Sequence, residues 1–421
     1  MKRFCLGFDL CEAYSQLSYY DEEKNSPESV SQSVNQETYL LPNIVFYGED
    51  TDQFYIGYEA QARRFEQKGQ VIEHIVANVE SISGHLLGGR PYSNKDLFFV
   101  LMDGYINEFL GRYPEAEIAK LVVAVYEYRK GLFRVLKEWA EHYGLSEEQF
   151  EICSHSNSYL HYVFHQSEDI RRNSVALFDY SSAGLDYYRI DVSKKNQVRM
   201  IQIVHKDYSA SMPYSMAEEG GDTLDMKFAK IAKGEMDKTY ISAVYLTGIG
   251  FADEWMKESL SSMYGGRRVF MGQNIYTKGA CYAAYSGSTT IEQDYMIRSD
   301  EMIPFDIGIY LDEEKRQFVP IALGCTEWYN MRGSIEIFLD DTRKLEMVYR
   351  DRIKNQLARE IIEINGLPKR PPKTTKLSLS VECYNERQGA IVIRDLGFGK
   401  LYPTTNKVYR KEFLVEQEEI N

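Results

Sequence analysis

The sequence predicts an α/β protein in two parts, with helix-covered sheets over residues 1–300 and a small all-β module over residues 301–421. The chain has 421 residues, more than one compact core usually holds, so we expect more than one domain. Residues 121–125 form a continuous apolar run of strand length, and an amphipathic helix follows, which is typical of a sheet covered on both faces. After about Ser299 the pattern changes to short strand-like runs separated by Gly, Asn and Pro turns.

The first part alternates apolar strands with helices. We expect strands at residues 4–10, 13–20, 44–47, 121–125, 174–179, 184–192 and 243–246, and helices at 132–143, 252–264 and 276–285. A further helical segment follows Gly57, and Gly144 is the expected C-cap of the helix at 132–143. Residues 21–37 are polar, contain Pro27 and predict a loop.

The second part contains only strand-like segments. They lie at residues 305–311, 318–321, 334–339, 377–383 and 390–394. Residues 368–372 contain three prolines and predict a crossing loop or a short linker. This pattern indicates a small all-β module.

The composition is ordinary for a globular protein, with 44% hydrophobic and 27% charged residues. No apolar run approaches the roughly 20 residues that span a bilayer, and residues 1–9 lack the apolar core of a signal peptide. The six cysteines include no C-x-x-C pair, so we expect neither a disulfide framework nor a structural zinc. A reducing cytoplasm is the expected compartment.

The net charge of −14 disfavours nonspecific binding to nucleic acid, which requires cations against phosphates. The charge is uneven, because residues 341–421 carry 16 Lys and Arg against 12 Asp and Glu, a local charge of +4 that leaves −18 for residues 1–340. We expect the basic residues to form a solvated surface or to attract an acidic partner.

Two predicted hairpins begin with a strand that ends in an acid, Asp9 in the first and Asp179 in the second. A third element runs from a strand through a Gly248-Ile249-Gly250 turn into the predicted helix at 252–264, and its glycines allow close approach of a flat ligand. Two carboxylates on facing hairpins can hold a hydrated cation, which in turn holds phosphate oxygens. The order of these elements therefore points to a phosphate-containing ligand.

The same segments resemble the DnaK-like heat-shock chaperones of the actin-like ATPase superfamily. Gly7–Ser15 is similar to the first phosphate motif G-I-D-L-G-T-T-x-S, Phe178–Asp186 to the second, D-L-G-G-G-T-x-D, and Tyr245–Gly250 to the adenosine motif V-L-V-G-G-S. Gly220–Asp225 resembles a G-G-x-x-x-D helix start, Tyr276–Ala283 resembles A-x-A-K-G-A-A-x-x-A, and Pro304–Ile309 resembles P-L-S-L-G-I, the opening of the substrate-binding sandwich. The motifs occur in family order, and the helical lid has no counterpart.

The resemblance implies a two-lobed actin-like, ribonuclease-H-like ATPase domain over residues 1–300 and a chaperone-type β-sandwich over 301–421. It implies ATP or ADP with Mg²⁺ as cofactors, the metal being held through waters by Asp9 and Asp179. The cofactor-binding residues that it implies are Asp9, Glu12, Asp179, Ser181, Ser182, Asp186, Gly220, Gly221, Gly248 and Gly250. The catalytic residues that it implies are Asp9, Asp179 and His155.

The sequence departs from these motifs where phosphate would bind. Glu12 stands in place of a hydroxyl residue and would bring a like charge toward phosphate. The Ser181-Ser182-Ala183 turn replaces three glycines, and each Cβ opposes close approach of backbone N–H groups. No lysine matches the one on the phosphate side of the family site.

His155 aligns with the catalytic glutamate of the family. It could orient or deprotonate a water, because histidine titrates near neutral pH, or it could be a packing histidine in a site without hydrolysis. A metal cluster of His155 with His161 and His165 is disfavoured, because only the last two share a helical face.

Three functions are compatible with these observations. The first is a binding or scaffold protein with a degenerate nucleotide cleft and absent or very slow hydrolysis. The second is a functional Mg-ATP-dependent chaperone-like ATPase, and the third an actin-like filament protein, which the sandwich disfavours. In the first two, a protein or peptide partner is expected at the C-terminal sandwich, where a sheet edge can accept an extended peptide.

Overall fold

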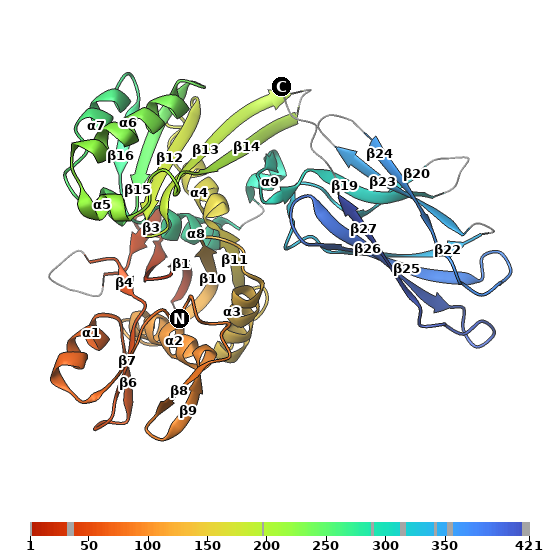
Figure 1. Ribbon diagram of the computed structural model, residues 1–421, viewed down its shortest axis with the longest axis horizontal. Helices are drawn as coiled ribbons and strands as arrows, with labels where there is room; N and C mark the ends of the chain where they lie inside the picture. Colours follow the sequence, from red (N-terminus) through yellow and green to blue (C-terminus); the bar gives the residue numbers. More distant parts are fainter. Residues whose placement is uncertain are drawn as a thin grey trace. The chain divides into compact units, whose positions relative to one another are not determined.

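Figure 1 shows a computed structural model of the protein. It describes residues 2–31, 38–195, 198–287, 290–311, 317–340, 343–351 and 357–414. The chain forms two compact units, one of Met1–Lys194 with Ile203–Tyr295 and one of Lys195–Gln202 with Met296–Asn421. The predicted combination of a mixed α/β fold with a C-terminal all-β region is confirmed.

One six-stranded sheet contains the N-terminal strand. Its order is β11-β10-β1-β2-β3, with β4 paired to β2. The bounds are β1 Arg3–Leu10, β2 Tyr14–Asp21, β3 Ser26–Ser29, β4 Leu41–Pro42, β10 Glu117–Val125 and β11 Phe150–Ser154. β1 and β2 are antiparallel, whereas β1, β10 and β11 are parallel, so the carboxyl ends of these three strands share one edge.

A second six-stranded sheet repeats this arrangement later in the chain. Its order is β16-β15-β12-β13-β14-β17. The bounds are β12 Ser174–Ser181, β13 Gly184–Lys195, β14 Val198–Asp207, β15 Ile241–Thr247, β16 Arg268–Met271 and β17 Met296–Arg298. β12 is antiparallel to β13 and parallel to β15, which is parallel to β16, so β12 occupies the position in this sheet that β1 occupies in the first.

Small sheets and the remaining helices complete the first unit (Figure 1). The strands are β5 Val45–Gly48, β6 Gln53–Ile56, β7 Gly69–Ile72, β8 Gly84–Leu87 and β9 Arg90–Ser93. The helices are α1 Gly57–Glu66, α2 Asn94–Leu110, α3 Lys130–Tyr143, α4 His155–Phe164, α5 Ser215–Glu219, α6 Asp222–Met236, η1 Ile249–Phe251, α7 Glu258–Met263, α8 Ile275–Ser286 and α9 Thr290–Asp294. The predicted C-cap is confirmed, because Gly144 ends α3 in the left-handed region at φ 90°.

Helix α8 packs against both β1 and α4, and two glycines allow the close approach. A Cβ at Gly7 would lie 2.2 Å from the carbonyl oxygen of Thr277, and one at Gly279 would lie 1.9 Å from that of Ser158. The Thr277 hydroxyl donates to the Gly7 carbonyl at 2.9 Å. This packing fixes the first turn of α8 beside the first turn of α4.

Two expectations for the first unit were wrong. No single helix spans residues 252–264, because the chain forms only η1 and then α7. The Asp225 carboxylate of α6 accepts the N–H groups of Glu258 at 2.7 Å and Ser259 at 2.9 Å, which caps α7 at that point. The expected loop at 21–37 includes β3, with Pro27 on an edge strand where its missing N–H is tolerated, while residues 32–37 lie outside the described ranges.

The second unit is a sandwich of two four-stranded sheets that share one hydrophobic core. The sheet orders are β20-β19-β23-β24 and β22-β25-β26-β27. The bounds are β19 Phe305–Leu311, β20 Gln317–Ala322, β22 Gly333–Leu339, β23 Lys344–Asp351, β24 Leu357–Glu363, β25 Thr375–Cys383, β26 Gln388–Gly397 and β27 Val408–Leu414, with the short β18 Met302–Ile303 paired to β21 Thr326–Glu327. The five predicted strands are confirmed, whereas β23, β24 and β27 were missed because charged residues interrupt their apolar pattern.

Within the described ranges, none of the helices combines the length and the apolar character needed to cross a membrane.

Candidate functional site

A cavity of about 440 Å³ lies in the first unit, at the carboxyl ends of β1, β10, β12 and β15. The carboxyl edge of parallel strands is where α/β sheets commonly bind ligands, and this volume is within the range of small-molecule sites. Its walls are the β1–β2 turn, the β12–β13 turn, the segments after β10 and β15, and the first turns of α4 and α8. No lysine is among the described residues that line it.

The floor of the cavity contains a buried ion pair between Asp9 and His155. Asp9 is near the end of β1 and His155 is the first residue of α4, and their side chains are 6% and 3% exposed. His155 Nε2 lies 2.7 Å from Asp9 Oδ1. Burial alone would lower the pKa of His155, but Asp9, helped by Asp179 and Asp186, outweighs burial and raises it above its ordinary value. The imidazole therefore serves as the counter-cation of Asp9.

The second predicted aspartate is bonded to a tyrosine. The hydroxyl of Tyr276, in the first turn of α8, donates to Asp179 Oδ2 at 2.9 Å. Burial raises the pKa of Asp179 to about 7, against the opposing effects of His155 and the Tyr276 hydroxyl. The Tyr276 and His155 rings are stacked, with centroids 3.7 Å apart and an interplanar angle of 11°. One stacked pair of side chains thus binds both aspartates that were expected to hold Mg²⁺.

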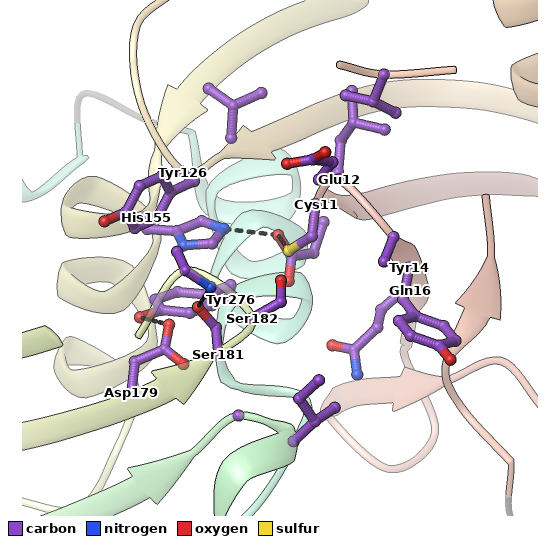
Figure 2. A pocket seen from close by; sticks show the side chains of 18 of the residues that line it. Cys11, Glu12, Tyr14, Gln16, Tyr126, His155, Asp179, Ser181, Ser182 and Tyr276 are labelled. Carbon is purple, nitrogen blue, oxygen red and sulfur yellow. Dashed lines mark hydrogen bonds and ion pairs between the residues drawn. The ribbon is translucent and has the colours of Figure 1, made fainter. Parts of the chain in front are cut away.

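Cys11 lies in the β1–β2 turn, beside the ion pair. Its sulfur is 3.7 Å from Asp9 Oδ1, and burial, with Asp9 and Asp179 nearby, raises the pKa of the thiol well above its ordinary value. The Asn43 side chain donates to the Cys11 carbonyl at 2.7 Å, which holds the turn in place. Figure 2 shows the His155 ring turned toward the Cys11 sulfur, with the Tyr276 ring beside it.

Three other predicted residues line the cavity at its turns. Glu12 is exposed and lies 3.8 Å from His74 Nδ1, so its charge is at the rim of the cavity. Ser181 is the last residue of β12 and Ser182 begins the β12–β13 turn, and the Ser181 hydroxyl accepts the Ala183 N–H at 3.2 Å. The Ala183 N–H is therefore already hydrogen-bonded within the protein and is not available to a phosphate.

The predicted glycines divide between the cavity and its surroundings. Gly248 lines the cavity at φ 97°, and a Cβ there would lie 2.6 Å from Asp179 Oδ1, so glycine is required for packing against β12. Gly250 packs under the Tyr180 ring. Gly220 and Gly221 precede α6, as predicted, but neither they nor Gly250 line the cavity.

Asp186 is buried behind the cavity wall. It pairs with Asp179 across the β12–β13 ladder, accepts the Tyr126 hydroxyl at 2.9 Å and lies 2.7 Å from His205 Nε2. Tyr126 itself lines the cavity, so Asp186 acts on the cavity through this ring and through its electrostatic effect on His155.

Sequence reasoning missed Cys11 and Tyr276 as members of the site. A signal was present for Cys11, which replaces a motif glycine, whereas Tyr276 falls at a variable position of the motif that its segment resembles and gave none. Which aspartate each would contact could not be read from the motifs, because Tyr276 is 97 residues from its partner in the chain.

These residues do not fit the hydrated Mg²⁺ that the resemblance implies. Mg²⁺ requires oxygen ligands in near-octahedral geometry and keeps several of its waters. Here Asp9 is bonded to a cationic imidazole, Asp179 accepts a tyrosine hydroxyl, and a sulfur lies beside them. No catalytic step through Mg²⁺ follows from this arrangement.

Two family models match the chain. One described as "Family of unknown function (DUF5716) C-terminal" matches residues 26–300, well over half of the chain, and one described as "Domain of unknown function (DUF8552)" matches residues 302–415. A search of curated proteins found no match. Neither description states an activity.

Proposed function

Because the chain belongs to the family of unknown function DUF5716, whose description states no activity, we propose its role from the site, the sheet order and the sequence motifs. The proposal is a divergent DnaK-like protein of the actin-like superfamily, whose cavity binds a nucleotide or a similar ligand without useful hydrolysis. Such a protein works by binding, as a scaffold or adaptor, and not by turnover.

The duplicated sheet order supports the actin-like part of this proposal. β3-β2-β1-β10-β11 and β14-β13-β12-β15-β16 follow the same order of hairpin strands and parallel strands. The two strands that carry Asp9 and Asp179 are equivalent in the two sheets, and both aspartates line one cavity. This is the arrangement that the sequence motifs imply for a two-lobed nucleotide-binding domain.

The ion pair between His155 and Asp9 is the main observation that supports a site without hydrolysis. A general base must have a free lone pair within reach of a water. His155 Nε2 is bonded to Asp9, its raised pKa favours the protonated form, and its other ring nitrogen is buried without a described partner. Phosphoryl transfer depends on positioning and on cations at the phosphates, whereas here His155 is paired with Asp9 and Arg129, at the cavity wall, is paired with Glu80.

A single-turnover assay with radiolabelled ATP and Mg²⁺ tests this proposal, with a DnaK-like chaperone measured in parallel. We expect no release of phosphate above the rate in buffer, together with calorimetric binding of ATP or ADP in the same preparation. Hydrolysis at a rate comparable to that of the chaperone, lost in Asp179→Ala, would show that the proposal is wrong. If the protein neither binds nor hydrolyses ATP, the scaffold role is retained and the cavity is not a nucleotide site.

The sandwich is the proposed site of partner recognition. Apolar side chains are exposed on it, including Phe338 at 51% and Phe398 at 44%, whose rings contact one another at 5.9 Å. We expect Phe338→Ser with Phe398→Ser to abolish cross-linking to partners recovered with the full chain, and Phe65→Ser, at an exposed phenylalanine of the first unit, to leave it unchanged. Equal recovery of partners with wild type, with the double variant and with Phe65→Ser would contradict a role of the sandwich in partner recognition.

A further inference from the structure

Three metal-ligating side chains of different chemistry meet on the cavity floor. One ligand atom each from Asp9, Cys11 and His155 lies within 4.8 Å of the other two. All three residues line the cavity, and Asp9 and His155 are buried. We propose that Asp9, Cys11 and His155 bind a borderline divalent metal ion of the Zn²⁺ class. This inference is independent of nucleotide binding and of hydrolysis.

The distances are close to those of a tetrahedral site. With ordinary Zn²⁺ bond lengths, ligand atoms lie about 3.6 Å apart for oxygen and sulfur and about 3.4 Å apart for oxygen and nitrogen. Cys11 Sγ is 3.7 Å from Asp9 Oδ1, and His155 Nε2 is 2.7 Å from the same oxygen. The oxygen–sulfur separation already fits, and the hydrogen bond needs to lengthen by about 0.7 Å as the ion replaces the shared proton.

Metal binding balances charge in this buried place. Cys11 loses its thiol proton to solvent and binds as a thiolate, and His155 binds as neutral imidazole through Nε2 with its remaining proton on Nδ1. Carboxylate and thiolate then offset the two charges of the ion, so a neutral cluster replaces the buried ion pair. Protons are released to solvent when the metal binds.

The donor set selects against the metal that the sequence motifs imply. A thiolate and an imidazole favour Zn²⁺, Co²⁺ and related ions, whereas Mg²⁺ prefers oxygen. Three protein ligands leave the fourth position of a tetrahedral ion open toward the cavity, as in sites that hold a water or a ligand. His155 Nδ1 has no partner among the described residues, so we expect affinity about 10–100-fold below that of a site with a supporting hydrogen bond.

Cobalt provides the test, because Co²⁺ bound to thiolate gives a charge-transfer absorption in the near ultraviolet. The full chain, treated with chelator under a non-thiol reductant, is titrated with Co²⁺ alone. We expect one equivalent to bind with this absorption in wild type and in the control Cys5→Ser, whose cysteine lies on β1 outside the cavity. We expect Cys11→Ser to lose the absorption and His155→Gln to weaken Co²⁺ binding at least 100-fold. In wild type, Zn²⁺ should displace the bound Co²⁺, whereas excess Mg²⁺ should leave the Co²⁺ bound.

A second measurement uses only the wild-type protein, in case Cys11→Ser fails to fold. Iodoacetamide labelling of each cysteine is followed by peptide mass with and without Zn²⁺. We expect Zn²⁺ to slow labelling of Cys11 at least tenfold and to leave Cys383, in the sandwich, unchanged. No thiolate absorption in wild type, the same absorption in Cys11→Ser, or equal labelling of Cys11 with and without Zn²⁺ would overturn the proposal.

Discussion

Removal of the His155 imidazole should destabilise the first unit strongly. In His155→Ala, Asp9 stays buried with 6% of its side chain exposed and loses its counter-cation. An unpaired buried charge of this kind costs about 3–5 kcal/mol, and loss of the aromatic stack on Tyr276 adds about 1 kcal/mol. Most of this cost comes from the charge, so addition of Asp9→Asn to His155→Ala should recover about 2 kcal/mol or more.

Urea unfolding of metal-free protein measures these free energies. A Trp328→Phe background restricts the fluorescence signal to Trp139 and Trp255 of the first unit. His142→Ala, at an exposed histidine on α3, is the control and should change the free energy of unfolding by less than about 1 kcal/mol. If the double variant is as unstable as His155→Ala or less stable, Asp9 is not an uncompensated charge, and the reasoning from the ion pair fails.

Three further predictions concern packing and charge elsewhere in the molecule. Gly279→Ala should lower the free energy of unfolding by about 3 kcal/mol or more, because its Cβ would meet the backbone of α4. Gly234→Ala, in open space on α6, should raise it by about 0.5–1 kcal/mol. Thermal unfolding of the two variants checks both values. Burial alone would raise the pKa of Glu235, but two lysines and a tyrosine outweigh it and lower the pKa to about 2. The ionised Glu235 therefore contributes on the order of 3 kcal/mol to the free energy of unfolding, fully above about pH 4.3 and progressively less as pH falls through 2. The difference in unfolding free energy between wild type and Glu235→Gln should narrow from pH 6 to pH 3. A constant difference would mean that the pairing of Glu235 is unimportant. Arg370→Met should cost the sandwich about 3–5 kcal/mol, because it leaves Asp395 buried without its bidentate partner, and calorimetry in which the sandwich transition does not move would contradict this.

Local patterns were sufficient to predict many of the elements that form the site. The apolar runs that end at Asp9 and Asp179, and the glycine turn after β15, predicted the strands and the turns that line the cavity. These signals are local, because alternation, apolar runs and turn residues depend on neighbours in the chain. The start of α7 could not be predicted in this way, because its cap comes from Asp225, more than 30 residues earlier.

The chemistry of the floor depends on contacts that no local pattern contains. His155 is 146 residues from Asp9 in the chain, and the motif alignment showed only that it replaces an acid. Its role follows from the fold, which packs α8 against α4 and so brings Tyr276 under the imidazole. Cys11 and His155 depart from two separate motifs and Tyr276 occupies a variable position of a third, yet the three side chains meet in one place. Independent decay of an unused site would not require them to compensate one another, whereas here two of them neutralise or bond the remaining aspartates.

The substitution that restores the motif at position 155 should destabilise the protein in a pH-dependent way. His155→Glu returns the acid of the resembled motif but places a second carboxylate at hydrogen-bond distance from Asp9. Two buried carboxylates this close cannot both ionise, so at least one pKa must rise by several units, at about 1.4 kcal/mol for each unit. His155→Gln has the same shape without the charge and is the matched reference. A raised pKa contributes stability at low pH that is lost as pH rises, so His155→Glu should be less stable than His155→Gln by several kcal/mol at pH 8 and by much less at pH 5. Equal stability of the two variants at pH 8 would mean that water reaches Asp9 and that the imidazole is not its required counter-cation.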